Sequence, residues 1–213
     1  AAIRMATGEF ILPVDADNRI RRPYLAEGPE LLARQPDVGV VYADAEYIGE
    51  KSGRWRVPEF NFACLVDKNF LDACALFRKR VWEDVGGYDE HPPHLGWEDW
   101  DFWLRASIKG WRFVRLNDVA WEYRVRPGSM LSAVNTNAKV MDDYLFTKAE
   151  LAPLGRIRAD VHRFINIEQS MEYRLGRVLL APVRRVLGRL QHGRNRTEPD
   201  LVREQMTSPN RQK

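Results

Sequence analysis

Hydrophobic and polar residues follow two different periods in the first part of the chain. Residues 10–14 and 38–42 are apolar on both faces, which is typical of strands buried between two layers. Residues 23–35 predict a helix that begins with a proline suited to a first turn and stops before Pro36. Its core candidates are Leu25, Leu31 and Leu32. This strand–helix–strand order predicts an α/β fold in which a mainly parallel sheet is flanked by helices.

The pattern continues with more aromatic residues. A helix is predicted at 97–109, with Trp103 and Ile108 facing the core and Asp101 paired with Arg105 on a polar stripe. Residues 44–69 show no sustained period and predict a short strand or hairpin followed by an irregular loop. The remaining expected elements are strands at 72–77, 111–114 and 120–124 and helices at 80–85 and 136–148.

Charge is distributed unevenly along the 213 residues, although the net charge is only +3. Residues 1–155 hold 20 Lys and Arg against 24 Asp and Glu, whereas residues 156–213 hold 13 against 6. A slightly acidic body is not the footprint of a nucleic-acid-binding domain. We therefore expect no nucleic-acid partner, a folded domain over 1–155, a basic helical extension over 156–190, and a disordered tail over 191–213.

The extension contains a basic amphipathic helix at 173–190, with leucines on one face and arginines on the other. This helix either packs on a protein surface, which we favour, or lies on anionic lipid. No apolar run is long enough to cross a bilayer, and two cysteines cannot make a disulfide framework. These features favour a cytoplasmic protein. If the helix lies on lipid, the protein would sit peripherally at the inner face of the membrane.

Two acidic pairs are candidates for chemistry. Asp15 and Asp17 follow the first predicted strand, where open α/β sheets bind their ligands, and two carboxylates can hold Mg²⁺ or Mn²⁺ against a diphosphate. The alternative is that they cap the turn into the next helix. Glu98 and Asp99 open the helix at 97–109, where Asp99 either acts as a general base or, with Glu98, complements the helix dipole.

Arg124 and Arg126 end the strand at 120–124 and run into a Pro-Gly turn. Either guanidinium could clamp a diphosphate through paired N–H donors, or remain a solvated loop charge.

Four segments of the chain are notable for their order and spacing: residues 6–17 (ATGEFILPVDAD), 76–90 (LFRK through GGYDE), 97–105 (WEDWDFWLR) and 123–130 (YRVRPGSM). Together they resemble family-2 inverting glycosyltransferases of the A-type fold, a nucleotide-diphospho-sugar transferase fold. The resemblance covers roughly residues 1 to 150. It implies transfer of a sugar from a nucleotide-diphosphate donor to a glycan or lipid-linked acceptor hydroxyl, with inversion and with Mn²⁺ or Mg²⁺ as cofactor.

The resemblance also implies roles for single residues. Asp17 would be the direct metal ligand, with Asp15 near the ribose or diphosphate, and Asp99 would be the base that deprotonates the acceptor. Arg126 stands where many relatives have His, and since a guanidinium does not bind a cation, we expect diphosphate contact from it, with Arg124 beside it. The acceptor side would be lined by Glu98, Gly87, Tyr88 and Trp97.

Members of this family begin with a nucleotide-binding segment that these 213 residues do not contain. We therefore expect this chain alone to bind nucleotide sugar poorly. The competing hypotheses are an inactive glycan-binding or scaffold module and a metal-dependent nucleotidyl or phosphoryl transferase.

Overall fold

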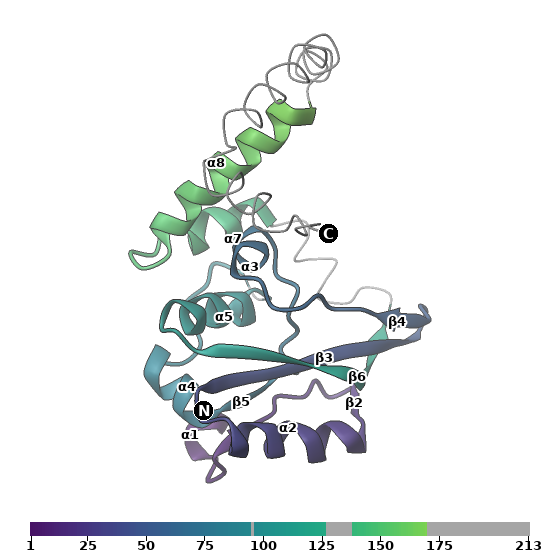
Figure 1. Cartoon of the computed structure of the whole chain (residues 1–213). Coiled ribbons are helices and arrows are strands. Elements are labelled where there is room, and N and C mark those ends of the chain that lie inside the picture. The colour runs from purple at the N-terminus through teal and green to yellow at the C-terminus, as the bar shows by residue number, and fades with distance from the viewer. Residues whose placement is uncertain (95, 127–137, 170–213) are drawn as a thin grey trace, which may run out of the picture. The chain divides into compact units, whose positions relative to one another are not determined.

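The computed structural model describes residues 1–94, 96–126 and 138–169 (Figure 1). Residues 1–159 form one compact unit. The described elements are α1 (Ala2–Met5), β1 (Phe10–Ile11), β2 (Arg19–Ile20), α2 (Arg22–Arg34), β3 (Val38–Gly49), β4 (Gly53–Trp55), α3 (Phe62–Asp67), β5 (Leu76–Arg78), α4 (Lys79–Val85), α5 (Glu98–Ile108), β6 (Arg112–Val125), α7 (Ala138–Leu145) and α8 (Ala152–Gln169).

The strands form one mixed sheet in the order β1-β5-β3-β6-β2, with β4 paired to β3 outside this path. The α/β class with helices on the sheet is confirmed, but the expectation of a mainly parallel sheet is wrong. Among the described strands, β3 and β6 pair in parallel and every other pairing is antiparallel. A parallel pair needs a long crossover, which α3, α4 and α5 provide between β3 and β6, whereas the short strands join by antiparallel pairing.

Helices cover both faces of the sheet (Figure 1). Helix α2 lies on one face, where its Tyr24 and Leu32 pack with Val41 of β3. Helices α3 and α5 lie on the other face, where Trp103 packs with Val40. Successive residues of β3 thus serve opposite cores, as the alternation of a strand requires.

The buried face of α2 includes Tyr24, the residue before the predicted core residue Leu25. Tyr24, Gly28 and Leu32 form the buried stripe, so Leu25, expected in the core, is 52% exposed. A side chain at Gly28 would place its Cβ 2.7 Å from the Leu76 side chain, so glycine lets the helix approach β5 closely.

The helix at 97–109 is confirmed as α5, with two differences in burial. Asp101 and Arg105 are buried rather than lying on an exposed stripe, and Ile108 is 45% exposed because it is the last residue of the helix.

Strands β3 and β6 are longer than the sequence pattern indicates. The predicted strand at 38–42 stops at Tyr42, because the residues from Asp44 onward show no sustained period, yet β3 continues to Gly49. The Asp44 carboxylate is fully buried and pairs with Arg54 and Arg115, each at 2.7 Å. The strands predicted at 111–114 and 120–124 are likewise one continuous strand, β6. Its register against β3 shifts near Asp44. A paired buried charge and an irregular register therefore interrupt the pattern without ending the strands.

The predictions for the C-terminal part lie largely outside the described residues. Helix α7 falls within the predicted helix at 136–148, and α8 runs through residue 155, where the domain boundary was expected. That boundary stays a prediction, as do the helix at 173–190, the tail at 191–213 and contact with a membrane. No helix in the described residues is long and apolar enough to cross a membrane.

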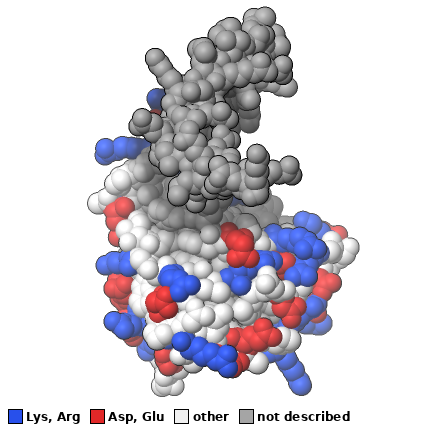
Figure 2. Space-filling view, viewed as in Figure 1, with Lys and Arg blue, Asp and Glu red and all other residues white. Residues whose placement is uncertain are grey.

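Positive and negative side chains are interspersed over the face of the described residues that Figure 2 shows. The basic field of one sign that a nucleic-acid surface presents is not seen on this face.

Candidate active site

Asp15 and Asp17 lie in the loop that joins β1 to β2. The strand ends at Ile11, earlier than predicted, and Asn18 holds the loop in place. Asn18 donates from its backbone N to the Asp15 carbonyl at 3.0 Å and from its side-chain Nδ2 to Asp15 Oδ2 at 3.3 Å. Burial raises the pKa of Asp15, and the charges of Asp17 and Glu98 raise it further. Asp15 therefore lies in a region of concentrated negative charge.

The end of β6 brings both predicted arginines to the same loop. The Arg126 guanidinium forms an ion pair with the Asp17 carboxylate. Arg124 donates from its backbone N to the Asn18 side-chain oxygen at 3.1 Å, and its Nε lies 3.4 Å from the Asp17 carbonyl oxygen. Antiparallel pairing of β2 with β6 causes this meeting of segments more than 100 residues apart. The two motifs thus form one charged surface.

Asp99 lies in the first turn of α5, partly buried. Its Oδ1 accepts from the Trp100 backbone N at 2.7 Å, and its Oδ2 accepts from the Asn69 side-chain Nδ2 at 3.1 Å. Burial, followed by the charge of Asp72, raises the pKa of Asp99 to about 8, with a smaller contribution from Glu98. A carboxyl group with such a pKa can take up a proton near neutral pH, which the role of general base requires.

The glycine-rich turn after α4 packs against α5, the helix that carries Asp99. Gly86 and Gly87 both have positive φ angles, of 82° and 86°, and Gly86 ends the helix. Tyr88 packs on Phe102 of α5 with ring centres 4.9 Å apart. Burial raises the pKa of Tyr88, and the nearby charges of Asp99 and Glu98 add to this effect. Tyr88 therefore packs on α5, the helix that carries Asp99.

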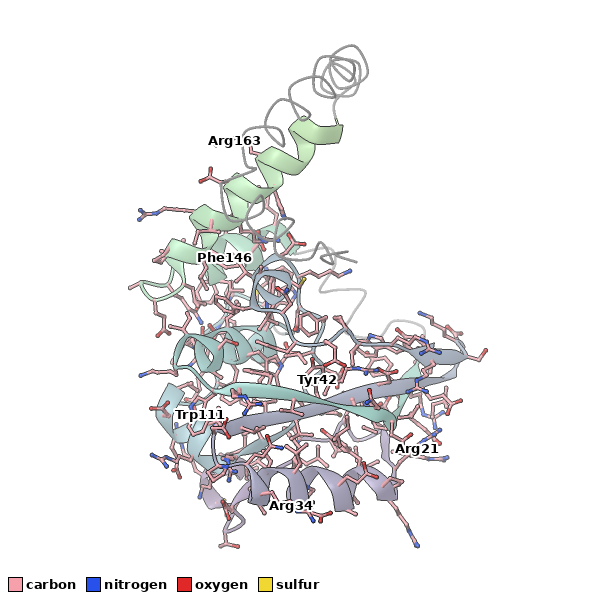
Figure 3. The ribbon with its side chains drawn as sticks, in the orientation of Figure 1. Arg21, Arg34, Tyr42, Trp111, Phe146 and Arg163 are labelled. Carbon is pink, nitrogen blue, oxygen red and sulfur yellow. The ribbon has the colours of Figure 1, made fainter. Side chains whose placement is uncertain are left out.

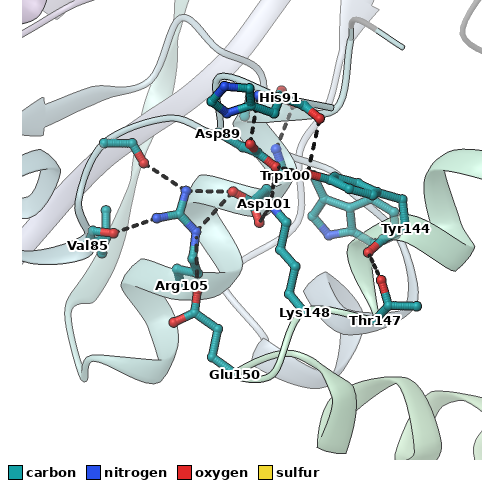
Figure 4. A network of polar contacts seen from close by, with 12 residues as sticks. Val85, Asp89, His91, Trp100, Asp101, Arg105, Tyr144, Thr147, Lys148 and Glu150 are labelled. Carbon is teal, nitrogen blue, oxygen red and sulfur yellow. Dashed lines mark hydrogen bonds and ion pairs between the residues drawn. The ribbon is translucent and has the colours of Figure 1, made fainter. Parts of the chain in front are cut away.

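Asp89, the next residue of the turn, belongs to a separate polar network (Figure 4). Its carboxylate accepts from the Tyr144 hydroxyl and from Lys148 Nζ, both at 2.6 Å. Lys148 also reaches Asp101 at 2.7 Å, and Asp101 pairs with Arg105 at 2.5 Å. Arg105 in turn donates to the carbonyls that flank the turn, those of Val85 at 2.6 Å and Gly87 at 2.8 Å. The network joins α5, α7 and the glycine-rich turn into one support.

The predicted acceptor-side residues lie in two places. Trp97 and Glu98 are next to Asp99, with Trp97 packed on Trp100 at 5.0 Å between ring centres. The glycine-rich turn, including Gly87 and Tyr88, lines an open polar hollow of about 450 Å³ beside the Lys148 network.

The described residues contain no group of three or more side chains placed to hold a metal ion. Mg²⁺ and Mn²⁺ suit one or two carboxylates plus substrate phosphates and water. Asp15 and Asp17 meet that requirement, and the repulsion that raises the pKa of Asp15 is what a bound cation would relieve. The donor set therefore fits a divalent cation whose remaining ligands would be phosphate oxygens and water.

Asn69 contacts Asp99 and the charge of Asp72 acts on it, but the sequence pattern predicted neither residue. Both belong to the segment between α3 and β5. Asp72 accepts from the Cys74 backbone N at 2.9 Å, and the charges of Asp72 and Asp99 are coupled. The polar run at residues 67–69 was the one local feature that could have drawn attention to this segment. It has no helix or strand period, so the sequence did not indicate where the segment lies in the fold.

Searched against protein-family models, the chain matches none. Among solved structures it is similar to S. aureus TarS residues 1–349 in complex with UDP-GlcNAc, with a TM-score of 0.53 and 19% identity over 80% of this chain and 51% of that chain. The complex of TarS 1–349 with UDP gives a TM-score of 0.51 and 19% identity, over 84% of this chain and 52% of that chain. The chain thus spans about half the length of these structures. The chain therefore shares the α/β fold of these TarS structures over the part that it covers.

Proposed function

We propose that the protein is part of a metal-dependent glycosyltransferase that moves a sugar from a nucleotide-diphosphate donor to a glycan or lipid-linked acceptor hydroxyl, with inversion. The observation that carries this proposal is the meeting of two predicted motifs, where Arg126 pairs with Asp17 and the Arg124 backbone N donates to Asn18. Burial and the charges of Asp17 and Glu98 raise the pKa of Asp15. Burial and the charge of Asp15 raise the pKa of Asp72, and burial and the charge of Asp72 raise that of Asp99. The fold, and the UDP-GlcNAc and UDP bound to TarS, support a nucleotide-diphosphate donor.

In this proposal Asp15 and Asp17 would hold the cation, and the chemistry it would supply when bound is neutralisation of negative charge on the diphosphate. Arg126, paired with Asp17 in the structure, turns its N–H donors to the diphosphate, and Arg124 lies beside it. These residues bind and orient the donor, and they stabilise the negative charge that leaves with the nucleoside diphosphate.

Asp99 accepts the proton of the acceptor hydroxyl as that oxygen attacks the anomeric carbon. The new carbon–oxygen bond forms as the bond from the anomeric carbon to the diphosphate oxygen breaks, and its electron pair leaves with the nucleoside diphosphate. Attack opposite the leaving group inverts the anomeric configuration. Two hydrogen bonds, from Asn69 and from Trp100, orient the Asp99 carboxylate for this step.

The test is an assay for nucleoside diphosphate released from a panel of nucleotide sugars, with Mn²⁺, Mg²⁺ or a chelator, on the longest open reading frame that contains this chain. Asp99→Asn should reduce turnover by about 10²-fold or more, as loss of a general base does. Asp143→Asn is the matched control, because Asp143 is an exposed carboxylate paired with Lys139 on α7. Release of pyrophosphate or phosphate instead would contradict the proposal. Glycan binding without turnover, unchanged in Asp99→Asn, would identify a binding module.

A further inference from the structure

The Asp99 carboxylate has a partner that comes from outside its own helix. Asn69 lies between α3 and β5, 30 residues before Asp99, and its Nδ2 is 3.1 Å from Asp99 Oδ2. The other end of the same amide is also engaged, because Asn69 Oδ1 accepts from the Leu71 backbone N at 3.1 Å. A backbone N–H can only donate, so this contact directs the oxygen of the amide toward Leu71 and its NH₂ group toward Asp99.

This arrangement is complementary to an ionised carboxylate. Each Asp99 oxygen accepts one N–H donor, from Asn69 and from the Trp100 backbone, which leaves further lone pairs free to accept a substrate proton. Other groups near Asp99 act in the opposite direction: the carboxylates of Asp72 and Glu98 repel its charge. Tyr88 of the glycine-rich turn is a neutral phenol, whose pKa is raised by burial and by the charge of Asp99.

We propose that Asn69 is a positioning residue that holds the Asp99 carboxylate in the orientation of the general base. The inference rests on the proposed function for the role of Asp99, but the contact itself does not depend on that role. The Asn69 amide lowers the pKa of Asp99, against the larger effects of burial and Asp72 that raise it. Loss of the amide therefore raises the pKa further and frees the carboxylate to rotate.

Two variants separate positioning from simple support of the loop. Asn69→Ala removes both contacts of the amide. Asn69→Asp keeps an oxygen for the Leu71 N–H but replaces the donor to Asp99 with a second carboxylate. If Asn69 only supports the loop, Asn69→Asp should have the turnover and the Asp99 titration of the parent. If Asn69 positions Asp99, the turnover of Asn69→Asp should fall at least as far as that of Asn69→Ala. Asn61→Ala is the matched control, because Asn61 caps α3 through the Cys64 backbone N at 3.1 Å.

The experiment is a titration of carboxyl signals by NMR in the full chain labelled with ¹³C-aspartate, with the Asp99 signal assigned from Asp99→Asn. We expect a midpoint at about 8 in the parent and in Asn61→Ala. The midpoint should be higher in Asn69→Ala. In Asn69→Asp the carboxyl groups at positions 69 and 99 titrate together in two steps, and the midpoint of the upper step should be higher still. Equal midpoints in the parent and both Asn69 variants would overturn the proposal.

Kinetics on the active protein provide the second measurement. The high-pH plateau of kcat should fall about 10-fold in Asn69→Ala with KM unchanged, as expected for one lost hydrogen bond to a charged group. An unchanged plateau in both Asn69 variants would also overturn the proposal. If the titrations shift as expected but the parent transfers no sugar, the proposed function has failed and the contact between Asn69 and Asp99 stands.

Discussion

The strongest stability prediction concerns Arg78, the last residue of β5. Its side chain is almost fully buried, and it donates to the carbonyls of Val38 at 2.8 Å and Gln35 at 3.0 Å as well as to that of Leu32. It also pairs with Glu9 at 3.0 Å. One guanidinium therefore ties the carboxyl end of α2 to the sheet.

Replacing Arg78 by Met keeps most of the apolar stem and removes every donor. Hydrogen bonds from a charged group contribute about 1.5 to 3 kcal/mol each, and such contacts are not additive. We therefore expect Arg78→Met to lower the free energy of unfolding by about 3 to 5 kcal/mol, the range typical of a broken buried network. That is a large part of the roughly 5 to 15 kcal/mol that stabilises a domain.

Arg34→Met is the matched control at the same end of α2. Arg34 is 75% exposed and pairs with Glu30 one turn earlier (Figure 3), so its loss should change stability by no more than about 0.5 kcal/mol.

Urea unfolding followed by tryptophan fluorescence measures both variants. Arg78→Lys, which keeps the charge without the planar fork, should fall between them and remains measurable if Arg78→Met does not fold. Equal losses in Arg78→Met and Arg34→Met, or a loss below about 1 kcal/mol in Arg78→Met, would refute the reasoning.

Three further predictions follow from the site and its support. Because folding raises the pKa of Asp99 from 3.8 to about 8, the folded state holds a proton that the unfolded chain releases, so stability should fall as pH rises through this window. Asp99→Asn should abolish that fall in denaturation curves measured from pH 4 to 9. Lys148→Met should lower the unfolding midpoint, because it removes the lysine partner of Asp89 and leaves Asp101 with Arg105 alone. Lys139→Met, at an 86% exposed side chain, should not lower it, and equal midpoints would contradict the network. Gly87→Ala should also destabilise, because the φ angle is 86° and the added Cβ would lie 2.9 Å from Trp82, and a thermal midpoint equal to the parent's would count against this geometry.

The sequence predicts local elements well where periodicity is strong. Helices α2 and α5 begin and end within about two residues of the predicted bounds, because proline, glycine and aromatic spacing mark them directly. It predicts poorly where a charge is buried. Asp44 breaks the apolar run of β3, and no local pattern shows that Arg54 and Arg115 neutralise it. The mixed direction of the sheet was also missed, since strand direction depends on how connections cross in space.

The sequence by itself determined which groups are available: carboxylates at 15, 17, 98 and 99, arginines at 124 and 126, and the glycines of one turn. Tertiary structure decided which of them act on each other. Pairing of β2 with β6 brought Arg126 to Asp17, and the segment between α3 and β5 brought Asn69 to Asp99. It also raised the pKa of Asp99, because desolvation and repulsion depend on neighbours that are distant in the chain. Residue type sets the chemistry that a side chain can perform, and packing sets its charge state and orientation.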